Sequence, residues 1–560
     1  MKIKFLKTMT MNKILTLIVL FYFNAVLVNA QDQIIHDAEY YIIEAQNGEK
    51  WASDDKKIDA KLKEFRKKNG NKAPNIVYIL LDDLGFGEIG MPDLAVTRGY
   101  KTPNISSFAD EGMSLQRMYT EPSCTPTRVS MMTGRLPTRT GMVEAKATIC
   151  GEGLPGSEVT IAEVLRDAGY NTAHIGKWHM GDVEQSYANK QGFMHAEFPI
   201  HQQAQLALFS KQAENAGIIQ SVEKSYQAQT FTLDNTFVPD PSDMVTGLEL
   251  RDGKLYEVDL KAGEKWTQQK YVEMNQRYQD HAIEQLQELS KKDEPFYLNY
   301  WPLFPLSFTL ADIDEFRTLN GGPIAERIVL MDEWVGEIID EVDRLGIAEN
   351  TLIVIMGDNG PFMQYANSSG QSDRIYRGGK GEHLEGGVRA NAFVRWKGMI
   401  EPGSSALDIT HISDLYTTFA RLAGATEHIP TDRIVDGIDQ SGVLLLGETN
   451  GRRDYIFIYE EHNLRSVVKN KYKMHLPPPG TNAILTAEFY DLYRDPRESR
   501  PQNSILMGPW AGGQFAVMIQ RHMINKKKYP DTPPIHDKPY EGIESLRPET
   551  QKLLDAFYGH

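Results

Sequence analysis

Cysteine is nearly absent from this chain, which contains only Cys124 and Cys150 among 560 residues. Two cysteines can form at most one bridge, so the disulfide framework that supports many small secreted proteins is excluded. A chain of this length does not need such a framework, because it can bury a large hydrophobic core. The length therefore predicts one large domain with a smaller one beside it.

An excess of positive charge is also lacking. The sequence has 60 Lys and Arg against 76 Asp and Glu, and its formal net charge is −16. Nucleic-acid binding requires a basic surface, so no nucleic-acid partner is expected. The same negative field repels small anions. An anionic substrate would therefore have to be held by cations placed locally in its site.

Long apolar runs are missing after residue 28, so no membrane span is expected in the mature chain. The first 30 residues have the form of a signal peptide: an apolar run from Ile14 to Val28 is followed by the small-residue site Val28-Asn29-Ala30. Four lysines precede or open this run: Lys2, Lys4, Lys7 and Lys13. Their removal, with no acid lost, takes the net charge from −16 to −20. We expect an exported protein, periplasmic or secreted; an uncleaved anchor is the alternative.

Short apolar segments alternate with helical ones after residue 74, which predicts a largely parallel sheet covered by helices on both faces. The expected strands are 74–81, 172–175, 296–300, 351–356 and 390–395, and the expected helices are 160–167, 268–289, 324–345 and 413–422. After about residue 445, short strand-like runs predict a small antiparallel sheet with a terminal helix. We therefore divide the chain into a signal peptide (1–30), an N-terminal adapter (31–73) with a helix over 55–68, a catalytic domain (74–445) and a C-terminal subdomain (446–560). A long polar stretch, 195–264, is expected as an insertion near the mouth of the active site.

Cys124 lies in the run Ser123-Cys-Thr-Pro-Thr-Arg128. Thr125 is a candidate N-cap, Pro126 suits a first helical turn and Gly134 ends the expected helix. Cys124 would then precede a helix N-terminus, where free N–H groups and the helix dipole favour negative charge. A merely buried or reactive thiol is the alternative interpretation.

Two acidic clusters follow expected strands. Asp82 and Asp83 end the first strand, and Asp358-Asn359-Gly360 follows the strand 351–356. Ligands of doubly wound sheets bind at the carboxyl ends of the strands. Three carboxylates and an amide oxygen favour a hard cation, Ca²⁺ over Zn²⁺. Asp82 and Asp83 can converge only if the chain turns there, which Gly85 and Gly87 allow. The alternative is ordinary loop acids that cap helices.

Three further groups could handle an anion. Lys177 and His179 are two residues apart, so in an extended chain they share a face and could hold an oxyanion and move a proton. Lys380 lies among glycines, in Arg377-Gly-Gly-Lys-Gly381, where a ligand could approach closely. Surface decoration and a flexible loop are the respective alternatives.

Taken together, these segments resemble the motifs of type I, formylglycine-dependent sulfatases of the alkaline phosphatase-like superfamily. The resemblance covers about residues 74–500 and rests on DD, CTPTR followed by GRLPTRTG, GKWHMG, DNGP, GGKGEHLEGGVR and FYDLYRDP, in the family's order. It implies that a maturation enzyme oxidises Cys124 to 3-oxoalanine (formylglycine). It also implies that one Ca²⁺ is held by five residues: Asp82, Asp83, residue 124, Asp358 and Asn359.

The resemblance further implies a covalent route, in which the formylglycine hydrate attacks sulfur and releases the substrate alcohol. Arg128 and Lys177 would stabilise the hydrate, Lys380 would bind sulfate, and His179 would take the remaining hydrate proton. Many family members protonate the leaving oxygen with the histidine of a Pro-His-x-Pro motif, but the matching run here, Trp301-Pro-Leu-Phe-Pro-Leu306, has none. His383 is our candidate substitute, with substrate contact or packing as its alternative role.

The expected substrates are sulfated carbohydrates, such as those of marine algae (ulvan among them) or glycosaminoglycans, with aryl sulfates as convenient substitutes. The aromatic residues Trp301, Phe304 and Phe308 could stack on sugar or pack in the core. Two other functions remain open: hydrolysis of phosphodiesters or phosphonates on the same fold, and a non-catalytic glycan-binding relative.

Overall fold

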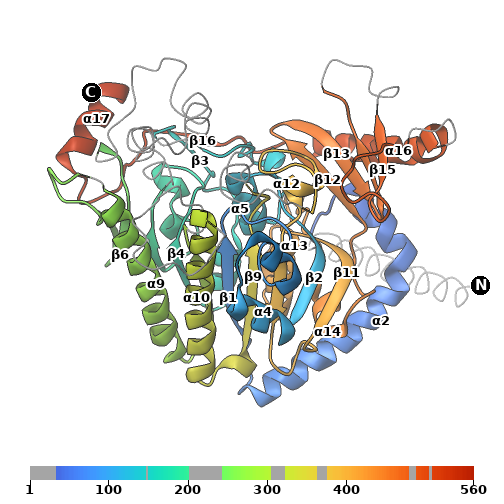
Figure 1. Ribbon diagram of the computed structural model, residues 1–560, viewed down its shortest axis with the longest axis horizontal. Coiled ribbons are helices and arrows are strands. Elements are labelled where there is room, and N and C mark those ends of the chain that lie inside the picture. Colours follow the sequence, from blue (N-terminus) through green and yellow to red (C-terminus); the bar gives the residue numbers. More distant parts are fainter. Residues whose placement is uncertain are drawn as a thin grey trace, which may run out of the picture.

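The computed structural model describes residues 33–146, 149–200, 243–265, 267–303, 322–361, 375–478, 487–502 and 507–559. The predicted signal peptide lies outside the described residues, as do Phe304 and Phe308. A sheet of ten strands forms the centre of the molecule (Figure 1). Its strands, in spatial order, are β11 (Ser404–His411), β2 (Met113–Tyr119), β10 (Ala392–Arg395), β9 (Thr351–Gly357), β1 (Asn75–Leu81), β8 (Phe296–Trp301), β4 (Asn171–Gly176), β5 (His195–Phe198), β6 (Leu248–Arg251) and β7 (Lys254–Glu257).

The middle of this sheet is parallel. β9, β1, β8, β4 and β5 all run the same way, whereas β10, β6 and β7 introduce antiparallel pairs. The burial of β1 on both faces explains why its sequence is apolar throughout. Ile76, Tyr78 and Leu80 enter one core cluster, and the alternating residues Val77, Ile79 and Leu81 enter the other. Side chains of a strand alternate between faces, so a strand covered on both sides must be apolar at every position.

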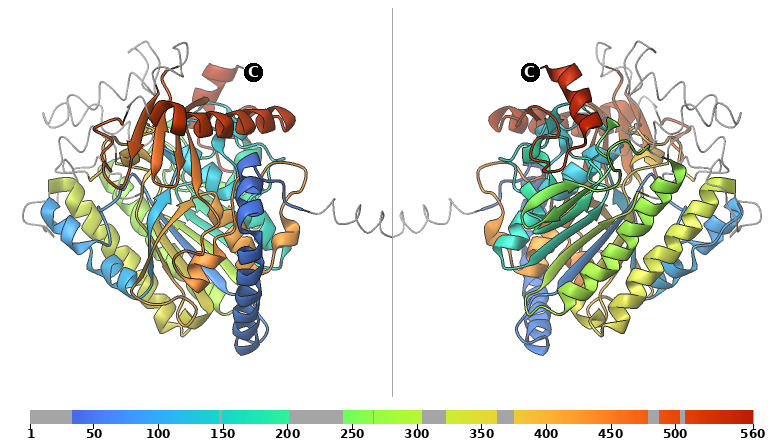
Figure 2. Two further views of the ribbon diagram at one scale, coloured as in Figure 1. Left: turned by 90° about the vertical axis from the view of Figure 1, so that its right-hand side faces the viewer. Right: turned by 90° about the vertical axis from the view of Figure 1, so that its left-hand side faces the viewer.

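Helices cover both faces of the sheet, as Figure 2 shows from either side. On one face lie α4 (Pro103–Asp110), α9 (Gln268–Ser290) and α10 (Gly322–Arg344), and on the other α2 (Ala38–Lys68), α5 (Cys124–Thr133), α6 (Ile161–Asp167) and α13 (Asp414–Ala423). Helix α6 starts at a capping box: the Thr160 hydroxyl accepts from the Glu163 N–H, and the Glu163 carboxylate accepts from the Thr160 N–H. The shorter segments are α3 (Pro92–Ala95), α12 (Glu385–Val388), α14 (Ser441–Leu446) and the two-stranded ribbon of β3 (Glu152–Gly153) with β16 (Ile535–His536).

A second, antiparallel sheet lies beside the end of the large one. It contains β12 (Tyr455–Glu460), β13 (Asn463–Lys469), β14 (Tyr472–His475) and β15 (Glu488–Asp491), in that order. One face packs on α2 and on α16 (Met507–Lys528), and the other packs against β2 and β11. The chain ends in α17 (Pro548–Tyr558), on the opposite side of the molecule (Figure 1).

The fold class predicted from the sequence is confirmed, including the large mixed sheet and the small antiparallel one. Two details differ. The adapter helix begins at Ala38 rather than Asp55, because its buried face continues upstream through Trp51 and Ile43. The polar stretch 195–264 is not only an insertion, since its described parts add β5, β6 and β7 to the central sheet. The residue limits of the domains stay a prediction.

None of the helices in the described ranges combines the length and the apolar character needed to cross a bilayer.

Candidate active site

Cys124 is the first residue of α5, the helix labelled near the upper end of the sheet in Figure 1. Ser123 occupies the N-cap position with an extended backbone (φ −153°, ψ 161°), and Gly134 ends the helix in the left-handed region at φ 67°. The expectation that Thr125 caps the helix is wrong. The Thr125 hydroxyl instead donates to the backbone oxygen of His179 at 2.8 Å. Cys124 and Cys150 are both free thiols, and the Cys124 side chain is fully buried.

The two acidic clusters meet at Cys124. Oxygens of Asp82, Asp83 and Asp358 and the sulfur of Cys124 all lie within 4.8 Å of one another. The turn that makes this possible is at Asp83 itself, whose φ of 54° lies in the left-handed region. Its N–H donates to Asp358 Oδ1 at 2.9 Å, so the two strand ends are joined directly. Asp82 and Asp83 therefore converge through the left-handed backbone at Asp83, and Gly87 follows with a φ of 86° that suits glycine.

Arg128 crosses this acidic cluster. Its Nη2 lies 3.2 Å from Asp82 Oδ1 and 3.0 Å from Asp358 Oδ2, and its Nη1 donates to the Lys177 carbonyl at 3.1 Å. The Lys177 ammonium lies 2.6 Å from Asp82 Oδ1. The Arg128 guanidinium also stacks over the Trp301 ring, 4.9 Å from its centroid. Trp301 is fully buried, so it packs in the core and does not offer a sugar-stacking surface.

Lys380 comes from the opposite side. Its ammonium lies 2.9 Å from the Cys124 sulfur and 2.8 Å from Asp83 Oδ1. Its loop is tied to the rest of the site by backbone hydrogen bonds from Lys380 N to Pro361 O (3.0 Å) and from Gly381 N to Pro122 O (2.6 Å). The glycines of this segment permit close contacts between backbones, since a Cβ on Gly360 would lie 1.8 Å from the Gly386 oxygen.

The two candidate histidines have different surroundings. His179 follows the end of β4 in a left-handed conformation (φ 59°), so the chain is not extended there and Lys177 and His179 do not share a strand face. The His179 Nε2 lies 3.0 Å from the Lys146 carbonyl oxygen. His383 lies on the Lys380 loop, and its Nδ1 is 2.5 Å from a carboxylate oxygen of Glu460 in β12.

Burial dominates the electrostatics of the site. It acts to raise the pKa of Asp82, but the adjacent charges of Lys177, Lys380 and Arg128 outweigh it and hold that pKa below its ordinary value. For Asp358, burial and the charge of Asp82 together raise the pKa. Burial also raises the pKa of the Cys124 thiol, which keeps it protonated and a poor nucleophile in its own right.

A hard cation fits this donor set. The set offers three carboxylates and the amide of Asn359, whose Oδ1 is buried with no hydrogen-bond partner among the described residues. Such an orphaned oxygen is satisfied if it ligates a metal. Charge favours the same conclusion: the three carboxylates are balanced by Arg128, Lys177 and Lys380, so a divalent ion would leave the site positive for an anion. No described cysteine or histidine cluster of the type preferred by zinc competes with it.

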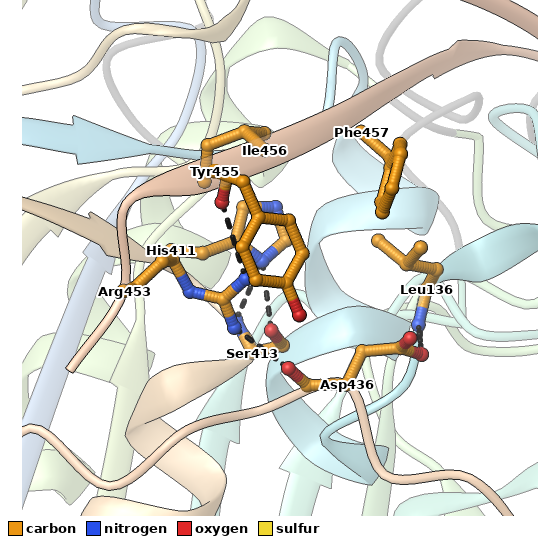
Figure 3. A pocket seen from close by; sticks show the side chains of 8 residues that line it. All are labelled: Leu136, His411, Ser413, Asp436, Arg453, Tyr455, Ile456 and Phe457. Atoms are coloured by element: carbon orange, nitrogen blue, oxygen red, sulfur yellow. Dashed lines mark hydrogen bonds between the residues drawn. The ribbon is translucent and has the colours of Figure 1, made fainter. Parts of the chain in front are cut away.

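A separate small cavity lies where the two sheets meet (Figure 3). Its volume is about 10 Å³, room for one water molecule at most. Arg453 lines it, with an ion-pair contact to Asp414 at 2.5 Å and a 2.6 Å hydrogen bond to the Asp436 carbonyl. The Asp436 carboxylate accepts from the Leu136 N–H at 2.8 Å. These contacts join the C-terminal sheet to the segment after α5, so the cavity is a structural joint and not a substrate site.

Comparison with known proteins identifies this arrangement. The family model described as Sulfatase matches residues 74–425. The chain belongs to the sulfatase family. It is 31% identical to human arylsulfatase A over 475 residues, covering 80% of this chain and 86% of that one, and 30% identical to mouse N-acetylgalactosamine-6-sulfatase over 421 residues, covering 72% of each.

Solved structures agree. The PsFucS1 sulfatase from a Pseudoalteromonas species superposes with a TM-score of 0.73 at 27% identity, covering 86% of this chain and 96% of that one. This sulfatase is thus a sulfuric ester hydrolase with the alkaline phosphatase-like fold. The phosphonate monoester hydrolase of Agrobacterium radiobacter shares the fold at 15% identity and a TM-score of 0.51, so the fold alone does not specify the ester.

One residue near the site was not found from the sequence. Glu460 lies in β12, 77 positions after His383, and no local pattern marks it. The sequence placed Cys124, Asp82, Asp83 and Asp358 together because they sit at predictable ends of a helix and of two strands, and their roles stay predictions.

Proposed function

We propose that this sulfatase hydrolyses sulfate esters of carbohydrates through a 3-oxoalanine (formylglycine) formed from Cys124, with one Ca²⁺ in the acidic cluster. The observation that carries the proposal is the position of Cys124. Its sulfur is at the N-terminus of α5, within 4.8 Å of three buried carboxylates and 2.9 Å from a lysine ammonium. A thiol with a raised pKa is not the nucleophile that this environment would select, whereas the hydrate of an aldehyde at the same position can attack sulfur.

The metal would be held by Asp82, Asp83, Asp358 and the Asn359 amide oxygen, together with residue 124. It would supply Lewis-acid stabilisation of the sulfate oxygens. The side chains around the metal site would stabilise the same sulfate group. Lys380 binds sulfate next to residue 124, and the N–H groups at the start of α5 favour the same negative charge. Arg128 and Lys177 hold Asp82 and Asp358 in place and stabilise the hydrate.

The role of His179 is to take the remaining proton of the hydrate, so that sulfate leaves and the aldehyde returns. Support for this role is its place next to the first turn of α5, where its carbonyl accepts from Thr125. The contact of its Nε2 with the Lys146 carbonyl orients the ring.

Three further proposals rest on separate observations. Since Cys124 is fully buried in the fold, a maturation enzyme would have to act before the chain closes over it. The form of residues 1–30 supports export to the periplasm or exterior. The names of the relatives, such as N-acetylgalactosamine-6-sulfatase, support a sulfated carbohydrate as substrate and a role in polysaccharide degradation, with aryl sulfates hydrolysed as well.

The test is to co-express the chain with a formylglycine-generating enzyme and to measure the mass of the peptide containing residue 124. Sulfate release is then followed on 4-nitrophenyl sulfate and on a panel of sulfated oligosaccharides, including ulvan-derived ones, with 4-nitrophenyl phosphate and a phosphodiester for comparison. We expect the aldehyde mass, sulfate release that Cys124→Ala abolishes, and loss of activity on chelation that Ca²⁺ restores. A correctly matured protein that hydrolyses only the phosphate esters would contradict the proposal.

A further inference from the structure

His383 joins the C-terminal sheet to the loop that carries Lys380. His383 is three residues after Lys380 on the loop that contacts Cys124, and its backbone N–H and its ring Nδ1 both lie within hydrogen-bond distance of Glu460 Oε1, at 2.8 and 2.5 Å. Glu460 is the last residue of β12. A carboxylate on Nδ1 fixes the ring orientation and the tautomer, and it leaves Nε2 as the second position from which the ring can donate.

Nothing in the described parts of the chain occupies that second nitrogen. No hydrogen bond from a described residue to His383 Nε2 is present, and 13% of the His383 side chain is exposed. His383 is therefore neither a fully packed core histidine nor a free surface one. Glu460 fixes the ring at Nδ1, and no described residue is hydrogen-bonded to Nε2. A ring held in this way can donate the Nε2 proton to a substrate.

We propose that His383 and Glu460 form the acid pair that protonates the leaving oxygen of the substrate, so that the C-terminal sheet completes the active site. The inference rests on the proposed sulfate ester hydrolysis. His383 is the catalytic acid, and Glu460 is a positioning residue that stabilises the imidazolium. The pair takes the place of the histidine that Trp301-Pro-Leu-Phe-Pro-Leu306 does not supply.

The charges around the pair keep Glu460 ionised. Burial acts to raise the pKa of Glu460, but the hydrogen bond and the charge of His383 outweigh it and hold that pKa below its ordinary value. Glu460 also pairs with Arg465 of β13 at 2.6 Å. On the other side the His475 ring lies 4.8 Å from the His383 ring, edge to face, and is itself bonded to Glu498 at 2.6 Å.

Lys473 fixes the backbone of the same loop. Its ammonium donates to the His383 carbonyl at 2.7 Å and pairs with Glu498 and Glu385 at 2.9 and 3.1 Å. Ser466 of β13 also donates to the His383 carbonyl, at 3.3 Å. Three strands of the small sheet thus hold the histidine: β12 contacts its ring, and β13 and β14 contact its carbonyl. The positive charge of Lys473 is compensated within its own buried pairs, and Glu460 is the carboxylate in direct contact with the His383 ring.

The proton balance of the step is simple. The hydroxyl of the hydrate at residue 124 gives its proton to solvent as its oxygen bonds to sulfur. The bond from sulfur to the leaving oxygen breaks, and its electron pair goes to that oxygen. The leaving oxygen takes the Nε2 proton of the His383 imidazolium and departs as an alcohol. The neutral ring keeps its Nδ1 proton, donated to Glu460, and regains the other from solvent.

The test compares two sulfate esters that differ in their need for an acid. The leaving group of a sugar or simple alkyl sulfate is a poorly stabilised alkoxide. The leaving group of 4-nitrophenyl sulfate is a stabilised phenolate that needs no proton. The variants are His383→Gln, Glu460→Gln and Glu460→Asp, with Glu461→Gln as the matched control. Glu461 is the next residue, exposed to solvent.

For His383→Gln we expect kcat/KM on the alkyl sulfate to fall by about 100-fold or more, while 4-nitrophenyl sulfate is hydrolysed nearly as before. For Glu460→Gln we expect a loss of roughly tenfold on the alkyl sulfate alone. Glu460→Asp should recover part of it, and Glu461→Gln should change neither rate. The wild-type rate on the alkyl sulfate should decline at alkaline pH where the rate on the aryl sulfate does not, and Glu460→Gln should move that decline to lower pH.

Equal losses on both esters in His383→Gln and Glu460→Gln would show that the pair only supports the loop, and would overturn the proposal. Unchanged alkyl sulfate hydrolysis in His383→Gln would overturn it as well. Both results are distinct from failure of the proposed function, in which the matured wild-type protein would hydrolyse neither sulfate ester.

Discussion

At the scale of the residue, Arg128 shows how the site combines structure with chemistry. The guanidinium is fully buried and contacts two carboxylates and one carbonyl, and its face lies on Trp301. Burial acts to lower the pKa of Arg128, but Asp358 and Asp82 outweigh it and raise that pKa, so the side chain stays charged. A planar fork can make these contacts at once, whereas a lysine ammonium is a single point of charge.

We therefore predict that Arg128→Lys keeps the charge but loses most of the activity, because the ammonium can pair with only one of Asp82 and Asp358. Arg128→Ala should lower the free energy of unfolding by about 3–5 kcal/mol, since both carboxylates are left buried and unpaired. Urea unfolding and sulfate release measure the two effects. Arg494→Lys is the control, because the Arg494 side chain is 79% exposed. Full activity in Arg128→Lys would show that the planar guanidinium is not required.

The acidic cluster could be located from the sequence, but its geometry could not. Asp82 and Asp358 follow apolar runs, and the ends of neighbouring parallel strands meet at one edge of a sheet. The left-handed turn at Asp83 and the contact between His383 and Glu460 have no such signal, because each depends on segments brought together only by the tertiary fold.

At the scale of the element, close approach between backbones shapes the loop after β9. Gly360 N donates to Gly387 O at 2.9 Å, and the Cα position of Gly360 faces the Gly386 oxygen. A methyl group there would meet backbone atoms, which have no rotamer through which to move away. The segment with Asp358 and Asn359 and the segment with Lys380 are thereby held against one another.

Two glycine-to-alanine changes should thus have opposite effects on the free energy of unfolding. Gly360→Ala should destabilise the protein by about 3 kcal/mol and lower activity, because its Cβ would lie 1.8 Å from the Gly386 oxygen. Gly48→Ala, inside α2 with no atom within 4 Å of the new Cβ, should stabilise it by about 1 kcal/mol through helix propensity. Chemical denaturation of both variants tests this pair, and two shifts in the same direction would refute it.

The elements themselves were predictable where the sequence pattern matched their surroundings. Strands covered on both faces, such as β1, β8 and β9, are continuous apolar runs and were expected within a residue or two. β11 was missed, because its exposed positions interrupt the apolar run. β5, β6 and β7 were missed because they are only four residues long and lie in a polar stretch.

At the scale of the whole molecule, a buried network of polar contacts joins the N-terminal helix α2 to helix α16 in the C-terminal part of the chain. Asp37, at the start of α2, pairs with Arg139 at 2.8 Å and with His522 of α16 at 2.8 Å. Burial acts to raise the pKa of Asp37, but His522 and Arg139 outweigh it and lower that pKa to about 2. A carboxyl group with a lowered pKa stabilises the fold above its ordinary pKa, and the stabilisation is lost as the pH falls towards 2.

The predicted consequence is a loss of about 2 kcal/mol from the free energy of unfolding between pH 4 and pH 2 that is absent in Asp37→Asn. At pH 7 the variant should already be less stable by a similar amount. Urea unfolding across this range measures both effects. Asp293→Asn is the control, since the Asp293 side chain is 99% exposed. Parallel stability curves for wild type and Asp37→Asn would show that Asp37 does not contribute.

The central place of β1 also has a consequence for synthesis. The strand is made early, yet its partner β8 follows 221 residues later and β9 later still. At about 5–20 residues per second, the ribosome needs roughly 10 to 40 seconds to deliver β8. During that interval the apolar segment 76–81 stays in the nascent chain with both strand edges unpaired. Chaperones that shield such segments should therefore determine the yield of folded enzyme more than its final stability does.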